Sequence, residues 1–122
     1  MVKWYRMAAE QGHAEAQAGL GSAFMYGTGV TLNPKEATNW LQKAAEQGVS
    51  DAQMALGFMY MEGECVEQDG EKAIEWFTKA AEQGLQGAMT TIGIMYQQGK
   101  GVPRDDDKAR EWFKKAGFDD VM

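Results

Sequence analysis

A five-residue sequence, Ala-Ala-Glu-Gln-Gly, occurs three times at the same spacing and constrains the fold more than any other feature. It stands at residues 8–12, 44–48 and 80–84, and a truncated copy, Ala116-Gly117, begins 36 residues after the third. The four tryptophans, at positions 4, 40, 76 and 112, follow the same spacing. A strict period of this length is typical of solenoids, in which each unit buries its apolar side against its neighbours. The sequence therefore predicts a repeat protein.

The period divides the chain into one domain, residues 1–122, made of similar units. We expect the closing helix of a partial repeat at 1–11, repeats at 12–47, 48–83 and 84–117, and a tail at 118–122. The first helix of each repeat is predicted at 14–26, 50–62 and 86–98, because apolar residues recur there at i, i+4, i+7 and i+8. A second helix follows in each unit, so the expected fold is all-α with seven helices.

Residues at fixed places in the period predict where these helices begin and end. Gly27, Gly63 and Gly99 follow the first helices, where a left-handed residue commonly ends a helix. Asn33, Asp69 and Asp105 are suitable N-caps for the second helices. Pro34 fits the first helical position, and Glu36 completes the spacing of a capping box with Asn33. Cys65 stands where the sister repeats have Gly29 and Gly101, so we expect its backbone to adopt a positive φ.

Small and large residues alternate on the predicted packing faces. Gly21, Gly57 and Gly93 lie inside the first helices, where glycine costs about 1 kcal/mol relative to alanine. Their recurrence in register predicts close approach of another helix backbone. We also expect Trp40, Trp76 and Phe77 of the second helices to be largely buried between units.

Composition narrows the class of function. A net charge of −6 argues against a nucleic-acid partner, which would require a clustered basic face. The single cysteine, Cys65, cannot form an internal disulfide. No apolar run approaches the roughly 20 residues of a membrane span. We expect a cytoplasmic location, with a periplasmic or secreted one left open if a leader has been removed.

The repeats resemble a known family, the Sel1-like repeats, which are relatives of the tetratricopeptide repeats. The second repeat carries most of the family signature. The matching residues are Ala52, Leu56, Gly57, Tyr60, Gly63, Val66, Lys72, Ala73, Trp76, Phe77, Lys79 and Ala80 to Gly84. Departures are Cys65 for a glycine, Phe24 for the tyrosine, and the truncated Ala116-Gly117.

The resemblance implies a right-handed α-solenoid of antiparallel helix pairs that acts as an adaptor for protein partners. Bacterial members serve signalling and secretion. Some cysteine-rich members have been linked to β-lactam binding, which leaves a hydrolase such as a β-lactamase-like enzyme as an alternative by analogy alone. Those members carry paired cysteines within a repeat, and this chain has one cysteine in all. A shared fold does not fix a function, so the partner must be argued from the surface.

The residues themselves give little support to catalysis. His13 is the only histidine and lies in a turn between units, and Cys65 is flanked by Glu64 and Glu67. Neighbouring carboxylates raise the pKa of a thiol and so oppose nucleophilic catalysis. The three aspartates at 105–107 suit a helix N-terminus better than a metal site. We therefore predict a protein that is not an enzyme and that has no catalytic residue, cofactor or metal.

A binding surface is predicted on the first helices. Once the packing positions are subtracted, a second face remains, which in this architecture lines the concave surface; we call it the first-helix face. Its predicted partner-binding residues are Met25, Tyr26, Met54, Phe58, Met61, Glu62, Thr90, Ile94 and Gln97. Exposed apolar patches usually mark interaction surfaces, and methionine adapts to varied partners. Packing between units remains the alternative for Met54, Phe58 and Met61.

The ends of the solenoid suggest a third possibility, self-association. Terminal repeats normally carry polar caps, whereas Trp4, Tyr5 and Met7 in the first helix are not polar. Phe118, Val121 and Met122 are candidates to cover the other end or to dock into a neighbouring molecule. The favoured partner is nevertheless a protein or peptide bound on the concave face.

Overall fold

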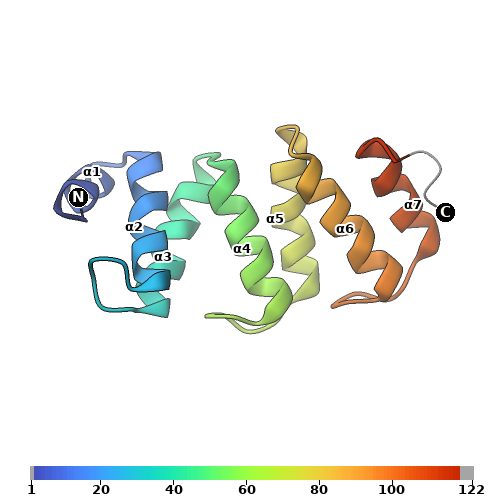
Figure 1. Ribbon diagram of the computed structural model, residues 1–122, viewed down its shortest axis with the longest axis horizontal. Coiled ribbons are helices and arrows are strands. Elements are labelled where there is room, and N and C mark those ends of the chain that lie inside the picture. The colour runs from blue at the N-terminus through green and yellow to red at the C-terminus, as the bar shows by residue number, and fades with distance from the viewer. Residues whose placement is uncertain (1, 119–122) are drawn as a thin grey trace. The chain divides into compact units, whose positions relative to one another are not determined.

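The computed structural model describes residues 2–118, which form seven helices and, within that range, no strand. Figure 1 shows their order along the chain. Their bounds are α1 Val2–Glu10, α2 Ala14–Tyr26, α3 Pro34–Glu46, α4 Ser50–Glu62, α5 Gly70–Glu82, α6 Gln86–Gln98 and α7 Asp106–Lys115. The first helices of the repeats, α2, α4 and α6, thus begin and end at the predicted residues. The all-α repeat fold is confirmed.

The chain divides into two compact units, residues 1–56 and 57–122, and the division falls inside α4. Unit 1 contains α1 to α3 and the first part of α4. Unit 2 contains the rest of α4 and α5 to α7. Each unit is described by itself below.

The predicted N-caps begin the second helices. The side chains of Asn33, Asp69 and Asp105 accept hydrogen bonds from the backbone N–H groups three residues further on, at 3.0–3.2 Å. The capping box at α3 is only half formed, because the Glu36 carboxylate accepts a hydrogen bond from the Trp40 indole (3.1 Å). The backbone N–H of Asn33, which a capping box would bind, instead donates to the Phe24 carbonyl at 2.9 Å.

Unit 1 has a core of small and large apolar side chains from α1, α2 and α3. Leu20, Phe24 and Trp40 are its large buried members, and alanines such as Ala37 let the helices approach. Two buried glutamines were not predicted as structural residues. The amides of Gln17 and Gln53 donate to the carbonyls of Ala9 and Ala45, both at 3.1 Å. Each glutamine thus adds a second hydrogen bond to a carbonyl near the end of the preceding helix, which already accepts one from the backbone N–H of Gly12 or Gly48, and so ties the two helices together.

The glycines inside the first helices receive a large side chain from the second helix of the same repeat. In unit 2, a Cβ atom added to Gly57 would lie 2.5 Å from the Phe77 ring, and one on Gly93 would lie 2.8 Å from the Phe113 ring. In unit 1, Leu41 takes the same place against Gly21. Phe77 is 0% exposed. The helices do approach closely at these glycines, but the predicted contact with a helix backbone was wrong, because the atoms nearest to each glycine belong mainly to a side chain of the second helix.

The expectation for the tryptophans holds only in part. Trp40 is buried and so is Phe77, but Trp76 is only partly buried. Its ring lies at the edge of α5, where Lys79 Nζ approaches the ring centroid at 5.7 Å. Lys43 and Lys115 stand in the same way over Trp40 and Trp112, at 4.7 and 4.3 Å. Because residues three apart share a helix face, these lysines shield the rings while their charge stays in water.

The glycine contact gives a direct test. We expect Gly57→Ala to lower the free energy of unfolding by roughly 1–2 kcal/mol, because overpacking typically costs 1–3 kcal/mol and exceeds the gain in helix propensity. Gly87→Ala is the matched control, since a Cβ on Gly87 of α6 meets no atom within 4 Å. That control should be neutral or stabilising by up to about 1 kcal/mol. Urea denaturation of both variants measures the difference, and equal effects would contradict the packing role of Gly57.

Candidate partner-binding surface

In unit 1, the predicted residues of the first-helix face differ in their exposure. Tyr26, at the end of α2, is 73% exposed. Met25 is partly buried and packs against the core cluster that contains Leu20 and Phe24. Met54 is also partly buried. Tyr26 is therefore the main apolar surface that this face offers in unit 1.

In unit 2, two large apolar side chains of the first-helix face reach the surface. Phe58 is 42% exposed and Ile94 is 38% exposed, and the two stand at equivalent positions of α4 and α6. The Phe58 ring meets the Phe77 ring edge to face, with centroids 5.1 Å apart. Phe58 thus contributes to packing with one edge while the rest of the ring remains accessible. Phe58 therefore combines a packing contact with an exposed surface.

Met61 is an exception to the predicted surface, because it is buried, with 7% of its surface exposed. It follows Gly57 by four residues and so lies on the side of α4 that packs on α5. Residues 54, 58 and 61 are spaced i, i+4 and i+7, so they point in somewhat different directions around the helix axis, and one of them can reach the core. Met61 therefore offers little surface to a partner.

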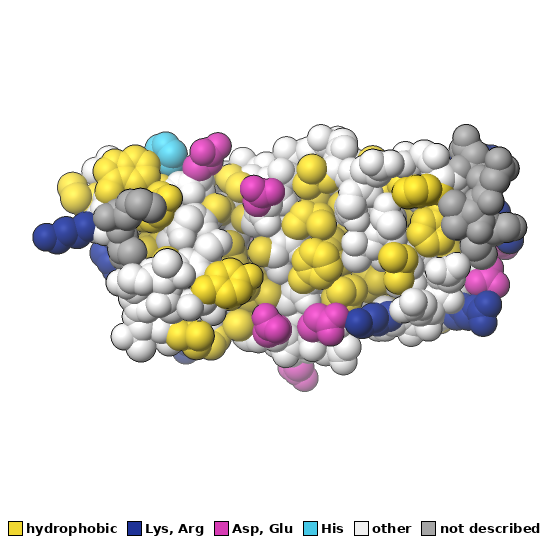
Figure 2. Space-filling model, in the orientation of Figure 1, with side chains coloured by type: hydrophobic (Ala, Val, Ile, Leu, Met, Phe, Trp, Pro, Cys, Tyr) yellow, Lys and Arg dark blue, Asp and Glu magenta, His cyan; other side chains and the backbone are white. Residues whose placement is uncertain are grey.

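The polar members of the face in unit 2 are held by local contacts. Glu62 forms an ion pair with Lys100 at 2.8 Å, and both side chains are about half exposed. The hydroxyl of Thr90 donates to the Gln86 carbonyl at 3.0 Å, and Gln97 is partly buried. Figure 2 shows hydrophobic side chains on the surface over α4 to α6, with charged side chains along one edge. The surface in unit 2 is therefore a mixed one, apolar at its centre.

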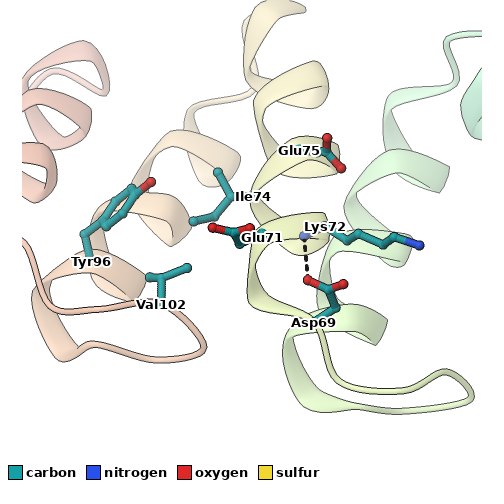
Figure 3. A pocket seen from close by; sticks show the side chains of 7 residues that line it. All are labelled: Asp69, Glu71, Lys72, Ile74, Glu75, Tyr96 and Val102. Atoms are coloured by element: carbon teal, nitrogen blue, oxygen red, sulfur yellow. Dashed lines mark hydrogen bonds between the residues drawn. The ribbon is translucent and has the colours of Figure 1, made fainter.

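A hollow beside α5 in unit 2 was not predicted from the sequence. It has a volume of about 490 Å³. Its lining residues are Asp69, Glu71, Lys72, Ile74, Glu75, Tyr96 and Val102. Figure 3 shows Ile74 and Glu71 facing Tyr96 and Val102.

The charged groups of this hollow have separate contacts. Asp69 caps α5, and Lys72 Nζ lies 5.4 Å from the centroid of the Tyr60 ring. Lys72 and Glu75 point away from Tyr96 and Val102 (Figure 3). The acidic and basic side chains therefore do not converge on one point, as general acid–base catalysis would require.

The two residues considered for catalysis, His13 and Cys65, occupy positions that the structure of the repeat explains. The side chain of His13 accepts a hydrogen bond from the backbone N–H of Ala16 at 3.2 Å, so His13 is the N-cap of α2. Cys65 is exposed and has φ 67°, as its place in the repeat predicted. Partial desolvation of the sulfur and the nearby Glu64 carboxylate raise the pKa of the Cys65 thiol. A raised pKa lowers the thiolate fraction and hence the reactivity of the thiol.

The aspartates at 105–107 have local partners as well. Asp105 caps α7, Asp106 pairs with Arg104 at 3.1 Å, and Asp107 pairs with Arg110 at 3.4 Å. Across residues 2–118 no three histidine, cysteine or carboxylate side chains are grouped to hold a metal ion.

No helix within residues 2–118 is long and apolar enough to cross a membrane. Phe118 is 44% exposed, whereas Val121 and Met122 lie outside the described residues.

A family model supports the repeat assignment across the chain. The model of the Sel1 repeat matches residues 2–13, 14–49, 50–85 and 87–117. The chain belongs to the Sel1 repeat family. Proteins of this family are generally non-catalytic scaffolds for protein–protein interaction. No curated protein matches the sequence.

Solved structures of Sel1 repeat proteins are similar to the chain. The protective antigen c5321 of uropathogenic Escherichia coli is 39% identical with a TM-score of 0.88, over 95% of this chain and 25% of that one. A Sel1 repeat protein from Oxalobacter formigenes is also 39% identical with a TM-score of 0.88, over 94% of this chain and 47% of that one. This chain thus spans a quarter to about half of those two proteins.

A more distant relative is the cysteine-rich protein B of Helicobacter pylori. It is 25% identical with a TM-score of 0.67, and the match covers 94% of this chain and 82% of that one.

The positive φ of Cys65 generates a stability prediction. A non-glycine residue in the left-handed region costs about 1 kcal/mol or more, whereas glycine adopts it freely. We expect Cys65→Gly to leave the melting temperature unchanged or to raise it, despite the greater freedom of glycine in the unfolded chain. Cys65→Ala, which removes the thiol but keeps the Cβ, is the control and should show no such gain. A clear drop in melting temperature for Cys65→Gly would show that the thiol itself is stabilising.

Proposed function

We propose that this Sel1 repeat protein binds a protein or peptide partner on the first-helix face. The observation that carries the proposal is the exposure of large apolar side chains on that face, where a helix surface without a partner would be polar. Phe58 and Ile94 each expose such a side chain in unit 2, and Tyr26 exposes an aromatic ring in unit 1. Aromatic side chains of this kind are frequent anchors of protein interfaces.

The charges around the face favour a particular kind of partner. Glu15 and Asp51 are exposed in the first turns of α2 and α4, and the chain as a whole carries −6. Glu62 already has Lys100 as its counter-ion, so its carboxylate attracts a second cation less strongly. A peptide with an apolar anchor beside lysine or arginine is complementary to this arrangement. The charges at the rim would raise the association rate more than the affinity.

Catalysis is the weaker alternative. The hollow beside α5 has acidic side chains, but they point to different sides of the helix. Cys65 has a raised pKa and His13 is engaged as a helix cap. A self-assembly role through the ends of the chain remains a separate proposal and does not use Phe58 or Ile94.

The repeat itself supplies variants for a test. Ser22 stands at the position equivalent to Phe58 and Ile94, so serine is compatible with the first-helix face. We expect Phe58→Ser and Ile94→Ser each to weaken binding of peptides selected on the folded protein by roughly tenfold or more, because buried anchors commonly contribute over 2 kcal/mol. Fluorescence anisotropy of the labelled peptides gives the dissociation constants.

Two controls separate binding from folding. Leu32→Ser changes a residue that is 56% exposed, lies in the loop between α2 and α3 and is not a member of the first-helix face, so it should not alter binding that depends on Phe58 and Ile94. The edge-to-face contact with Phe77 predicts that Phe58→Ser costs about 1–2 kcal/mol of stability. A loss of 3–5 kcal/mol, as for a core phenylalanine, would instead assign Phe58 to the core. Unchanged affinity in both serine variants would refute the proposed face.

A further inference from the structure

The hollow beside α5 in unit 2 has no role in the proposed function. Its volume of about 490 Å³ lies within the range of roughly 300–1,000 Å³ that is typical of ligand pockets. Glu71 and Ile74 of α5 form one wall, and they face Tyr96, near the end of α6, and Val102, in the loop that follows α6 (Figure 3). None of these residues belongs to the first-helix face, so a ligand in the hollow would leave that face free.

A close contact between backbones holds the two walls together. A Cβ atom on Gly70 would lie 2.0 Å from the carbonyl oxygen of Gly101, so the first turn of α5 lies directly on the loop after α6. The two sister repeats have proline and aspartate in place of Gly70. Glu71 follows Gly70 and Val102 follows Gly101, so the contact sets the separation of the walls. The hollow is therefore preformed, which lowers the cost of ordering it when a ligand binds.

The walls of the hollow are apolar on both sides. Ile74 stands where the sister repeats have Thr38 and Arg110, so its apolar side chain is particular to the second repeat. Ile74, Tyr96 and Val102 are each partly buried, and part of each side chain remains accessible from the hollow. An accessible surface of this kind favours the apolar part of a ligand.

The hollow also carries negative charge that the described chain does not neutralise. Glu71 faces the opposite wall, and Asp69 and Glu75 add negative charge at the margin. Lys72 also lines the hollow, but its side chain points away from the opposite wall (Figure 3). Within residues 2–118, no lysine or arginine forms an ion pair with Glu71 or Glu75. By contrast Asp107, the equivalent of Glu71 in the third repeat, has an arginine partner at 3.4 Å.

The excess of acidic residues is confined to the same segment of the second repeat. Residues 67–75 contain four acidic side chains and one basic side chain. The equivalent residues 31–39 contain one of each, and residues 103–111 contain four acidic and three basic side chains. The site that combines a preformed hollow with apolar walls is thus also the one that is complementary to a positive charge.

We propose that this hollow receives an arginine side chain from a segment of a partner protein. The guanidinium would pair with the Glu71 carboxylate, and the methylene groups would lie against Ile74, Tyr96 and Val102. Arginine suits the site better than lysine, because its planar guanidinium is more weakly hydrated and can form two hydrogen bonds to one carboxylate. Lys108 Nζ already lies 5.3 Å from the centroid of the Tyr96 ring, so the carboxylate is the group that would bind the incoming charge.

A second copy of this chain is a less suitable source of that arginine. The sequence has three arginines, at positions 6, 104 and 110. Arg104 and Arg110 each pair with a neighbouring aspartate, at 3.1 and 3.4 Å, and the Arg6 guanidinium lies 5.7 Å from the centroid of the Phe24 ring. Each arginine of a folded copy would have to give up such a contact in order to enter the hollow. We therefore assign the occupant to another protein.

The experiment titrates the full chain, labelled with ¹⁵N, with the peptide acetyl-Gly-Ser-Gly-Arg-Gly-Ser-Gly-amide and follows the backbone amide signals by NMR. We expect saturable shifts of the signals of Glu71, Ile74 and Val102, which give the dissociation constant. A peptide with citrulline in place of arginine keeps the shape of the side chain without its charge. It should bind more weakly by roughly tenfold or more, because hydrogen bonds between charged groups are the stronger ones. A peptide with lysine should also bind more weakly.

The repeats supply protein variants that the fold tolerates. Glu71→Lys and Ile74→Thr introduce the lysine and the threonine of the first repeat. The first should weaken binding by roughly tenfold or more and the second by about threefold, through lost charge pairing and lost apolar contact respectively. Glu82→Gln removes a charge about 16 Å further along α5, beyond the Debye length, and should change binding by no more than about twofold. Phe58→Ser should bind the peptide like the wild type, which separates this site from the first-helix face.

Several results would overturn the proposal. Equal binding of the arginine and citrulline peptides would show that charge is not recognised, and equal or tighter binding of the lysine peptide would refute the assignment to arginine. Unchanged binding to Glu71→Lys, with circular dichroism showing that variant folded, would place the peptide elsewhere. Free arginine amide that binds as tightly as the peptide would assign the hollow to a small molecule. Sedimentation of the protein alone should give a monomer, and a dimer that Glu71→Lys dissociates would assign the hollow to a second copy.

Discussion

The contact of one large side chain with one glycine holds each repeat together. Phe77 lies so close to Gly57 that a Cβ atom there would be 2.5 Å from the ring, and Phe113 on Gly93 and Leu41 on Gly21 repeat the arrangement. A glycine inside a helix is unfavourable by about 1 kcal/mol, but burying an aromatic side chain contributes roughly 1.5–3 kcal/mol. Burying the side chain therefore stabilises the repeat by more than the glycine costs, and the contact fixes how the second helix lies on the first. Once that pairing is fixed, one side of each first helix is used for packing and the opposite side is left to solvent.

The loops between paired helices depend on a second constraint, close approach of backbones. A Cβ atom on Gly70 would lie 2.0 Å from the carbonyl oxygen of Gly101, so the start of α5 touches the loop after α6 directly. Gly101 has φ 77°, and Cys65 takes the same conformation at φ 67° without the freedom of glycine. The loop backbone is thus set by the repeat, and an exposed cysteine follows it. Its strained backbone and raised thiol pKa are consequences of that position and do not indicate a reactive site.

The helices, their caps and the glycine contacts could be predicted because each is specified locally and then repeated. Asn33, Asp69 and Asp105 act as caps whatever surrounds them, and the 36-residue period marked Gly57 as a packing residue. Whether a single side chain lies on the buried or the exposed side of its helix was harder to predict. Met61 was placed on the first-helix face by its spacing, yet it lies four residues after Gly57 and is buried beside α5. Trp76 was placed in the core, but a lysine covers its outer face instead.

Differences between the repeats point to function more clearly than their similarities. The glycine at 21, 57 and 93 is the same in all three repeats, because the covering side chain leaves no room for a Cβ. The next residue along each of these helices faces solvent and is Ser22, Phe58 or Ile94. Packing does not require the same residue type at that position, so the residue there can differ from repeat to repeat. A serine, an aromatic ring and a branched aliphatic chain at equivalent places give each repeat a different surface chemistry. The binding role that we propose would use this combination, in which the contact with glycine supports the fold and the variable position beside it contacts the partner.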